Sequence, residues 1–170
     1  MRAPGSVVIL RHSYAPGGFD PPDSKLDDCS TQRNLDDDGR AQARRIGEAF
    51  RKNGVEVGKV LSSPRCRCLD TARLAFSRVE PWRVLQGALN DADLRKSRLA
   101  DVRQVIAAHR TGPPLVLVTH GSVVGDLTTS RWASSWSCAA PRTEPTWLRG
   151  SCTSSKTVSP IRLMTDRRNE

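Results

Sequence analysis

The chain has 170 residues, enough for one domain with a hydrophobic core of its own. It carries 27 Lys and Arg residues against 18 Asp and Glu residues, a formal charge of +9, but the basic residues are scattered along the chain. This scatter argues against nucleic acid as a partner, and the apolar runs are too short to span a membrane, so we expect no nucleic-acid and no membrane partner.

Short apolar segments alternate with segments of helical period along the first 128 residues. The apolar segments have the length of strands, whereas the helical segments repeat their apolar residues every three or four positions. We predict strands at residues 6–10, 59–61, 84–85 and 115–119, and helices at residues 36–53, 66–77 and 99–109. Residues 13–34 contain several Pro and Gly and are predicted to form a long loop. The alternation predicts an α/β domain with a mainly parallel sheet.

Polar residues follow three of these strands at the point where each strand ends. The pair Arg11-His12 follows the first strand, Ser62-Ser63 ends the second, and Thr119-His120-Gly121 ends the fourth. Arg67 lies a few residues beyond the second strand. Because the carboxyl ends of parallel strands meet at one edge of a sheet, these groups are expected to line one pocket, and their chemistry suits phosphate.

Four motifs resemble those of the histidine phosphatase superfamily, also called the phosphoglycerate mutase-like fold. In chain order they are LRHS at residues 10–13, LDDDGRAQA at residues 35–43, SSPRCRCLDTA at residues 62–72 and VTHG at residues 118–121. Two positions depart from the family pattern, since Ser13 stands in place of Gly and Asp36 replaces Thr as a helix cap. The resemblance covers about residues 6–128 and is closest to small bacterial members. It implies a three-layer sandwich with a mainly parallel central sheet.

The resemblance also implies a mechanism. His12 would attack phosphorus and become transiently phosphorylated, because neutral imidazole is a good nucleophile near pH 7. Arg11, Arg67 and His120 would surround the phosphoryl oxygens and neutralise their charge, and the hydroxyl of Ser13 would also bind phosphate. Water would then hydrolyse the phosphohistidine, with no metal and no cofactor required. His12, His120, Arg11 and Arg67 are therefore the predicted catalytic residues, and Ser13, Arg11, Arg67 and His120 the predicted substrate-binding residues.

The motifs leave the general acid unassigned. Family members place a Glu or Asp after the third strand to protonate the leaving oxygen, and here that region contains Asp91 and Asp93. Either residue can serve as the acid, and either can equally cap the next helix, which is the interpretation that we favour. Arg65 is interpreted as a solvated residue of a first helical turn, and His109 as the end of an amphipathic helix.

The five cysteines are Cys29, Cys66, Cys68, Cys138 and Cys152. Their odd number and irregular spacing predict neither a disulfide framework nor a zinc site, so we expect buried or free thiols. Cys29, Cys66 and Cys68 lie in segments near the predicted pocket, where they could pair in an exported relative. The N-terminus leads directly into the first predicted strand, without room for a signal peptide, so a cytoplasmic location is expected, although relatives in the periplasm are compatible with this.

Residues 129–170 differ in character from the domain at residues 6–128. They contain 14 Ser and Thr in 42 positions and three of the four Trp, and they show neither a helix nor a strand period. In a shifted reading frame, codons compatible with residues 131–155 can encode two strands joined by an Asp-Gly turn, followed by a stop. We therefore hypothesise that a single-base insertion or deletion near residues 128–131 leaves the last hairpin of the fold missing and the tail disordered. The alternative is a genuine divergent tail, which an intact frame in independently sequenced DNA would establish.

Together these features predict a metal-independent phosphatase that acts on a phosphomonoester or a phosphoprotein. The alternative is a catalytically inactive or truncated member of the family that at most binds phosphorylated ligands. No feature of the sequence identifies the substrate or the oligomeric state.

Overall fold

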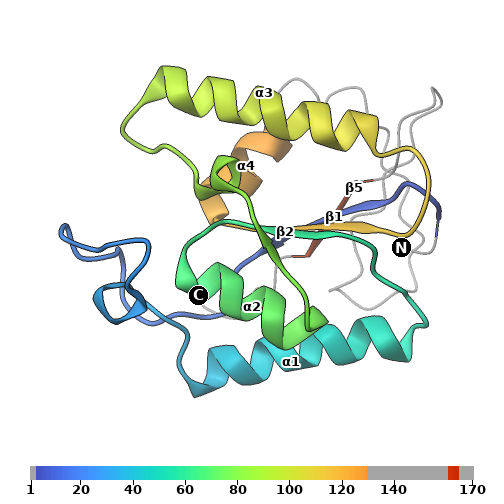
Figure 1. Cartoon of the computed structure of the whole chain (residues 1–170), viewed down its shortest axis with the longest axis horizontal. Helices are drawn as coiled ribbons and strands as arrows, with labels where there is room; N and C mark the ends of the chain where they lie inside the picture. Colours follow the sequence, from blue (N-terminus) through green and yellow to red (C-terminus); the bar gives the residue numbers. More distant parts are fainter. Residues whose placement is uncertain (1–2, 130–160, 165–170) are drawn as a thin grey trace.

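The computed structural model describes residues 3–129 and 161–164, which form a three-layer α/β sandwich (Figure 1). Its strands are β1 (Val7–Arg11), β2 (Val60–Ser62), β3 (Glu80–Pro81), β4 (Leu115–Thr119) and β5 (Ile161–Met164). They form one sheet in the order β3-β2-β4-β1-β5, and every strand pairing is parallel. The predicted fold class, an α/β sandwich with a mainly parallel central sheet, is confirmed.

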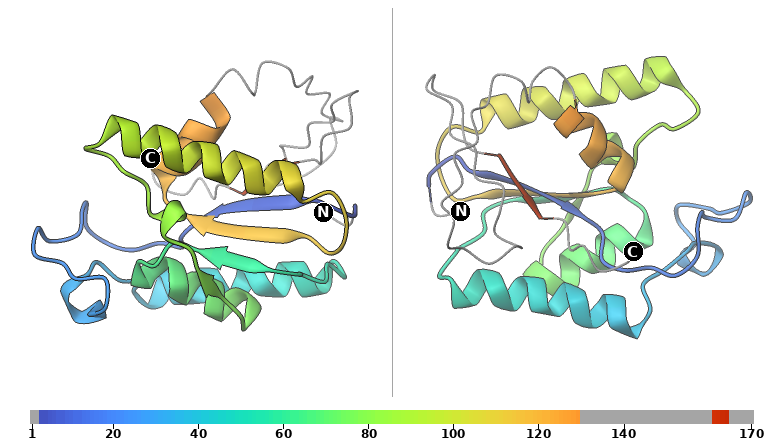
Figure 2. Two further views of the ribbon diagram at one scale, coloured as in Figure 1. Left: turned by 45° about the horizontal axis from the view of Figure 1, so that its top comes forward. Right: turned by 180° about the vertical axis from the view of Figure 1, so that it is seen from behind.

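Helices cover both faces of the sheet (Figures 1 and 2). One layer consists of α1 (Asp37–Lys52) and α2 (Cys66–Phe76), and the other of α3 (Ala92–Ala108) and α4 (Gly121–Thr129). Helices α1 and α2 approach each other closely at Gly47, where a Cβ atom would lie 2.1 Å from the carbonyl oxygen of Ala75. Only glycine therefore fits at this contact. None of the four described helices combines the length and the apolar character that spanning a bilayer requires.

Capping side chains determine where helices α1 and α3 begin. Asp36 accepts a hydrogen bond of 2.8 Å from the Gly39 N–H at the start of α1, as predicted. Helix α3 begins seven residues before the predicted residue 99, because Asp91 accepts a hydrogen bond of 2.9 Å from the Leu94 N–H and caps a longer helix.

The strand predicted at residues 84–85 is wrong. These residues lie in the 3-10 helix η2 (Arg83–Gln86), and β3 occupies the two residues Glu80–Pro81 instead. The Leu85 side chain is fully buried, and its carbonyl oxygen accepts a hydrogen bond of 2.6 Å from the Thr119 hydroxyl. Burial rather than strand pairing therefore explains the apolar character of this segment.

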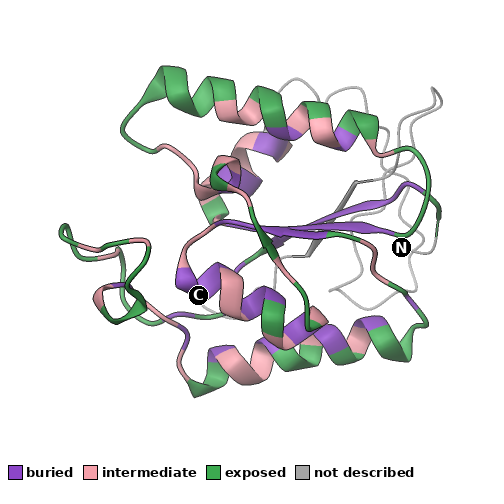
Figure 3. Ribbon diagram, in the orientation of Figure 1, coloured by how far each residue is buried: buried purple, intermediate pink, exposed green. Residues whose placement is uncertain are grey.

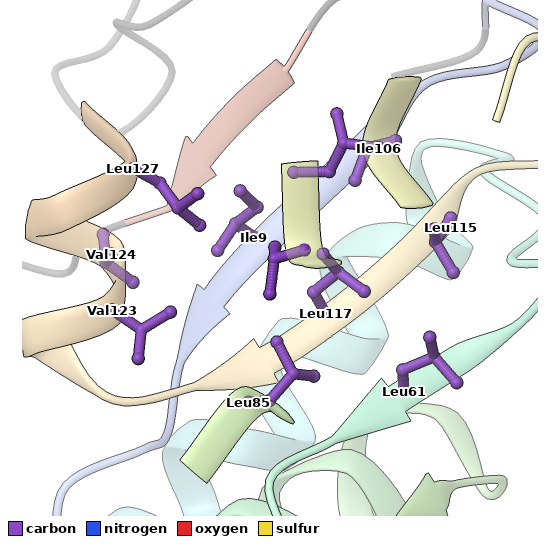
Figure 4. Close-up of a cluster of buried hydrophobic side chains, with 11 residues drawn as sticks. Ile9, Leu61, Leu85, Ile106, Leu115, Leu117, Val123, Val124 and Leu127 are labelled. Carbon is purple, nitrogen blue, oxygen red and sulfur yellow. The ribbon is translucent and has the colours of Figure 1, made fainter. Parts of the chain in front are cut away.

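The core has two parts, one on each face of the sheet. Along β1, Val7 and Ile9 belong to the cluster under α3 and α4, whereas Val8 and Leu10 belong to the cluster under α1 and α2. Figure 4 shows the first cluster, and Figure 3 shows that the central strands are buried along their length. Each such side chain contributes about 1.5–3 kcal/mol when it is removed from water. The ends of β1 and β4 are therefore held in place from both sides.

One strand lies in the segment where the sequence showed none. Strand β5 pairs with β1, with Val7 opposite Ile161 and Leu10 opposite Met164. The expectation that residues 129–170 contain no strand is therefore wrong for this short piece. Residues 131–155, to which the frameshift hypothesis refers, lie outside the described residues, so the missing hairpin and the disorder of the tail stay predictions.

Candidate active site

Three strand ends meet at one edge of the sheet, as the parallel arrangement predicted. The His12 N–H, just after β1, donates a hydrogen bond of 2.9 Å to the Thr119 carbonyl at the end of β4. The Ser63 N–H, just after β2, donates one of 2.9 Å to the Val118 carbonyl. The rings of His12 and His120 consequently lie side by side, with their centroids 5.6 Å apart.

The hydrogen bonding of His12 fixes its tautomer. Its Nδ1 lies 2.7 Å from the carbonyl oxygen of Ser13, and because a carbonyl only accepts, Nδ1 carries the hydrogen and Nε2 keeps the lone pair. Burial, together with the charges of Arg67, Arg11 and Arg33, lowers the pKa of His12 to about 4 against the opposing effect of the Ser13 hydrogen bond. His12 is therefore neutral at pH 7, with an unprotonated nitrogen available for attack.

His120 is neutral as well, and its N–H is already engaged. The Arg67 guanidinium, which only donates, lies 3.4 Å from His120 Nδ1, so Nδ1 accepts and the Nε2 hydrogen points to the Ser63 hydroxyl at 2.8 Å. Burial, together with the charges of Arg67 and His12, lowers the pKa of His120 to about 3. The Cys68 thiol packs 3.7 Å from His120 Nε2, and burial raises the pKa of Cys68 to about 12, so this sulfur is an inert neighbour.

Arg67 lies in the first turn of α2 and is almost completely buried. Its Nη1 contacts both carboxylate oxygens of Asp20, at 2.7 and 2.9 Å. Arg11 is exposed at the end of β1, and its side chain lies against Gly121, the first residue of α4. Within the described part of the chain, Arg67 Nε and the Ser13 hydroxyl are buried without a hydrogen-bond partner. A bound phosphoryl group is an acceptor that suits both of these atoms.

Sequence reasoning missed two residues of this site, Asp20 and Arg33, which both belong to the loop at residues 13–34. Arg33 Nη1 donates hydrogen bonds of 2.8 Å to the carbonyls of Ala15 and Gly17, and this shapes the loop. The Arg33 N–H donates to Asp20 at 3.0 Å. A loop has no periodicity that marks a contact residue. The available signal was that Asp20 is the one charged residue among residues 13–22.

Asp91 and Asp93 lie on the surface at the start of α3, both exposed. Asp91 caps that helix, so the favoured capping interpretation is confirmed for this residue. The interpretation of Arg65 as a solvated residue is wrong, because its side chain donates a hydrogen bond of 3.0 Å to the Ser24 hydroxyl and lies 3.7 Å from Asp20. His109 ends α3, as expected.

A disulfide links Cys29 of the 3-10 helix η1 (Cys29–Thr31) to Cys66, the first residue of α2. The expectation that the cysteines are buried or free thiols is therefore wrong for this pair and confirmed for Cys68. Cysteine spacing missed the pair because the loop folds back onto α2, where the Cys66 N–H donates a hydrogen bond of 3.0 Å to Gln32. Cys138 and Cys152 lie outside the described residues.

A groove of about 430 Å³ lies at the opposite end of the sheet, between Leu115 at the start of β4 and His109 at the end of α3. It is remote from the paired histidines, and its walls include Trp82. No group of three or more His, Cys, Asp or Glu side chains within the described ranges is arranged to hold a metal ion.

Comparison with known proteins connects this geometry to a family. The model of the histidine phosphatase superfamily (branch 1) matches residues 24–95, which contain the second and third motifs. A search of curated proteins gave no match.

Solved structures share the fold at low sequence identity. The Agrobacterium tumefaciens protein assigned as phosphohistidine phosphatase SixA is 23% identical over 71% of this chain and 72% of that chain, with a TM-score of 0.53. A mycobacterial glucosyl-3-phosphoglycerate phosphatase is 20% identical over 72% of this chain and 79% of that chain, with a TM-score of 0.52. The Escherichia coli protein assigned as an α-ribazole-5′-P phosphatase is 16% identical over 94% of this chain and 96% of that chain, with a TM-score of 0.58.

The parallel sandwich with two histidines at adjacent strand ends resembles the phosphoglycerate mutase-like fold. The chain resembles the histidine phosphatase superfamily, whose model matches somewhat less than half of its length.

Proposed function

We propose that the chain is a metal-independent phosphatase that hydrolyses a phosphomonoester or a phosphoprotein through a phosphohistidine intermediate on His12. The observation that carries this proposal is the hydrogen bond of 2.7 Å between His12 Nδ1 and the Ser13 carbonyl. It fixes the proton on Nδ1 and leaves the lone pair of Nε2 free for attack on phosphorus.

The first step forms the bond between His12 Nε2 and phosphorus as the bond to the leaving oxygen breaks. The ring keeps its Nδ1 hydrogen and becomes positively charged, and the Ser13 carbonyl stabilises this charge through the existing hydrogen bond. Arg67 and Arg11 offer fixed positive charge to the phosphoryl oxygens. Because Arg67 is buried, its interaction with a bound phosphoryl group is screened little by water.

The second step is hydrolysis of the bond between nitrogen and phosphorus. Water attacks the phosphohistidine, inorganic phosphate leaves, and neutral His12 is restored. The low pKa of His12 helps here, because burial disfavours the charged phosphorylated ring and makes the imidazole a good leaving group.

The substrate class follows from the phosphoryl group alone. The proteins of similar fold are named for phosphohistidine, glucosyl-3-phosphoglycerate and α-ribazole-5′-phosphate, which share little besides that group. We therefore propose a phosphorylated small molecule or a phosphoprotein as the partner. The exposed Tyr14 and Phe19 of the loop offer aromatic surface beside the site for the rest of the substrate.

The second candidate function is phosphate binding without turnover. It is favoured by one observation, that Asp91 and Asp93 are exposed at the start of α3 and Asp91 is engaged as a cap. An inactive member would bind orthovanadate or phosphate at the same arginines and histidines but release no product.

Hydrolysis of p-nitrophenyl phosphate in excess EDTA tests the proposal. We expect activity in the wild type, and loss of at least about 10³-fold in His12→Ala, since the nucleophile is gone. His109→Ala is the matched control. His109 lies at the C-terminal end of α3, beside the start of β4 and not beside the strand ends of the candidate site, so this variant should retain full activity. Phosphate binding by calorimetry, without hydrolysis by the wild type, would instead establish the inactive alternative.

The cellular location is a separate proposal. The sequence predicts the cytoplasm, whereas the disulfide between Cys29 and Cys66 favours a compartment in which thiols oxidise. We give more weight to the disulfide, and therefore propose an oxidising compartment. Fractionation of cells that express the native gene, with thiol labelling of the two cysteines, would decide: labelled cysteines in a cytoplasmic fraction would contradict this proposal.

A further inference from the structure

The proposed reaction needs a proton for the leaving oxygen, and neither histidine of the site can supply it. Both rings are neutral, because burial lowers their pKa values to about 4 and about 3. The one hydrogen of His12 is held by the Ser13 carbonyl, and that of His120 points to the Ser63 hydroxyl. A separate acid is therefore required for any substrate whose leaving group is poor.

Asp20 is placed for this task. Within residues 3–129, it is the one carboxylate that forms an ion pair with an arginine of the predicted phosphate site. Its oxygens lie 2.7 and 2.9 Å from Arg67 Nη1, while Nη2 of the same guanidinium lies 3.4 Å from His120 Nδ1. The carboxylate is thus one guanidinium away from the paired histidines. Its side chain is 13% exposed, so it lies in the wall of the site rather than in solvent.

We propose that Asp20 is the general acid that protonates the leaving oxygen, and that its carboxylate then accepts the proton of the attacking water. This inference rests on the proposed phosphatase function and assigns the role that the sequence left open between Asp91 and Asp93. It places the acid on the loop at residues 13–34, which comes directly after the nucleophile, and not after the third strand.

The charges around Asp20 explain how it changes protonation during the cycle. Burial raises the pKa of Asp20, but the hydrogen bonds from Arg67 and the Arg33 N–H and the charge of Arg65 lower it overall, so the free enzyme holds a carboxylate. A bound phosphoryl group shares the Arg67 guanidinium and adds negative charge nearby. Both effects raise the pKa of Asp20 in the complex. His120, which also faces this group, is neutral and does not oppose the change.

The proton balance closes without a further reactant. A phosphomonoester binds as its monoanion, whose second pKa is about 6, and passes its proton to the Asp20 carboxylate. His12 Nε2 bonds to phosphorus, the bond to the ester oxygen breaks, and that oxygen takes the proton from Asp20 and leaves as an alcohol. Water then attacks phosphorus and gives its proton to the Asp20 carboxylate. The bond between His12 and phosphorus breaks, and phosphate leaves with the proton from Asp20.

The test compares two esters that differ in their need for an acid. Phenolate is a poor leaving group, whereas p-nitrophenolate is stable enough to leave without a proton. In Asp20→Asn, which keeps the size and a hydrogen-bonding oxygen, we expect kcat for phenyl phosphate to fall about 10²–10³-fold. For p-nitrophenyl phosphate we expect a fall of less than about 10-fold, and burst formation of the phosphoenzyme from this ester should persist.

Asp23→Asn is the matched control, because Asp23 lies exposed in the same loop. The activities of this variant on phenyl phosphate and on p-nitrophenyl phosphate should both equal those of the wild type. Asp20→Glu should recover part of the phenyl phosphate activity, since it restores an acid. Thermal melting of each variant shows whether it folds.

An equal loss on both esters would overturn the proposal, because Asp20 would then only position Arg67. Unchanged activity on phenyl phosphate, or a lower KM with unchanged kcat, would overturn it as well. Wild-type enzyme that hydrolyses neither ester would overturn the proposed function itself, and the role of Asp20 with it.

Discussion

The candidate site has two halves that are held in different ways. In the strand-borne half, His12 and His120 follow two adjacent parallel strands, and backbone hydrogen bonds of the sheet set their separation. In the loop-borne half, Asp20 and Arg33 come from a segment of 22 residues whose one regular element is the 3-10 helix η1. One disulfide and a few side-chain contacts hold this loop against the start of α2.

This difference separates the proposed nucleophile, which the sheet positions, from the proposed acid, which the loop positions. The sheet is stabilised by two core clusters, so the proposed nucleophile, His12, is held in position whenever the domain is folded. The loop has little apolar surface to bury, so its position depends on polar and covalent contacts that substitution or reduction can remove. Arg67 belongs to both halves, since one nitrogen contacts Asp20 and the other lies close to His120.

Among the changes that test the comparison between the two halves, removal of the residue that they share, Arg67, should give the largest effect. We expect Arg67→Ala to lower kcat/KM for p-nitrophenyl phosphate by about 10²–10³-fold, because it deletes a donor to the transferring phosphoryl group. It should also lower the free energy of unfolding by about 3 kcal/mol, because Asp20 is left partly buried without its partner. Arg73→Ala is the control, an exposed arginine on the same helix whose ion pair with Asp70 is at the surface. Equal activities of the two variants would contradict this assignment.

Opening the disulfide should perturb the loop-borne half alone. We expect Cys29→Ser with Cys66→Ser to lower the free energy of unfolding in urea by about 2–4 kcal/mol, since the link closes a segment of 37 residues. The KM for phosphoesters should rise several-fold while phosphoenzyme formation on His12 persists. Dithiothreitol should reproduce both effects in the wild type and change nothing in the double variant. Reductant that abolishes activity in the double variant would show that this prediction is wrong.

The smallest effect is the pH dependence of stability, which reports on the strand-borne half. The folded pKa values of His12 and His120, about 4 and about 3, are below the ordinary value of 6.5. The unfolded chain therefore binds protons first as the pH falls, so this contribution to stability is complete above pH 6.5 and is lost toward pH 4. The free energy of unfolding should drop by about 1 kcal/mol between pH 7 and pH 6.

Urea titrations at several pH values measure this slope, and His12→Asn should make it shallower but not abolish it, because His120 still contributes. Asp20, whose pKa is lowered from 3.8, adds a further loss only at more acidic pH. A free energy of unfolding that is constant between pH 7 and pH 5 would mean that the histidines are solvated and not buried.

The features that could be predicted from the sequence are those marked by a hydrophobic pattern or by a local capping residue. The predicted bounds of the two strands that precede the histidines agree with the structure to within one residue, because each strand is a continuous apolar run that is buried on both faces. Asp36 was recognised as a cap from its position before a helical pattern. The convergence of the three strand ends followed from the parallel arrangement alone.

What the sequence did not predict depends on contacts between distant residues. The pairing of Asp20 with Arg67 joins residues 47 positions apart, and the pairing of Cys29 with Cys66 joins residues 37 apart. A loop gives no period from which its path can be inferred, so these partners emerge only from the fold. The strand predicted at residues 84–85 failed for a related reason, because burial in a 3-10 helix gives the same apolar letters as a short strand.

The disulfide also determines at which stage the loop loses its conformational entropy, during folding or during ligand binding. Ordering a backbone residue costs about 1–2 kcal/mol, and a free loop beside a pocket bears this cost each time that it closes over a ligand. Cys29 and Cys66 tie the loop to α2 in the unliganded chain, next to Arg67. Most of the ordering is therefore completed during folding, and under the proposed function the binding energy of the phosphoryl group does not have to order the loop.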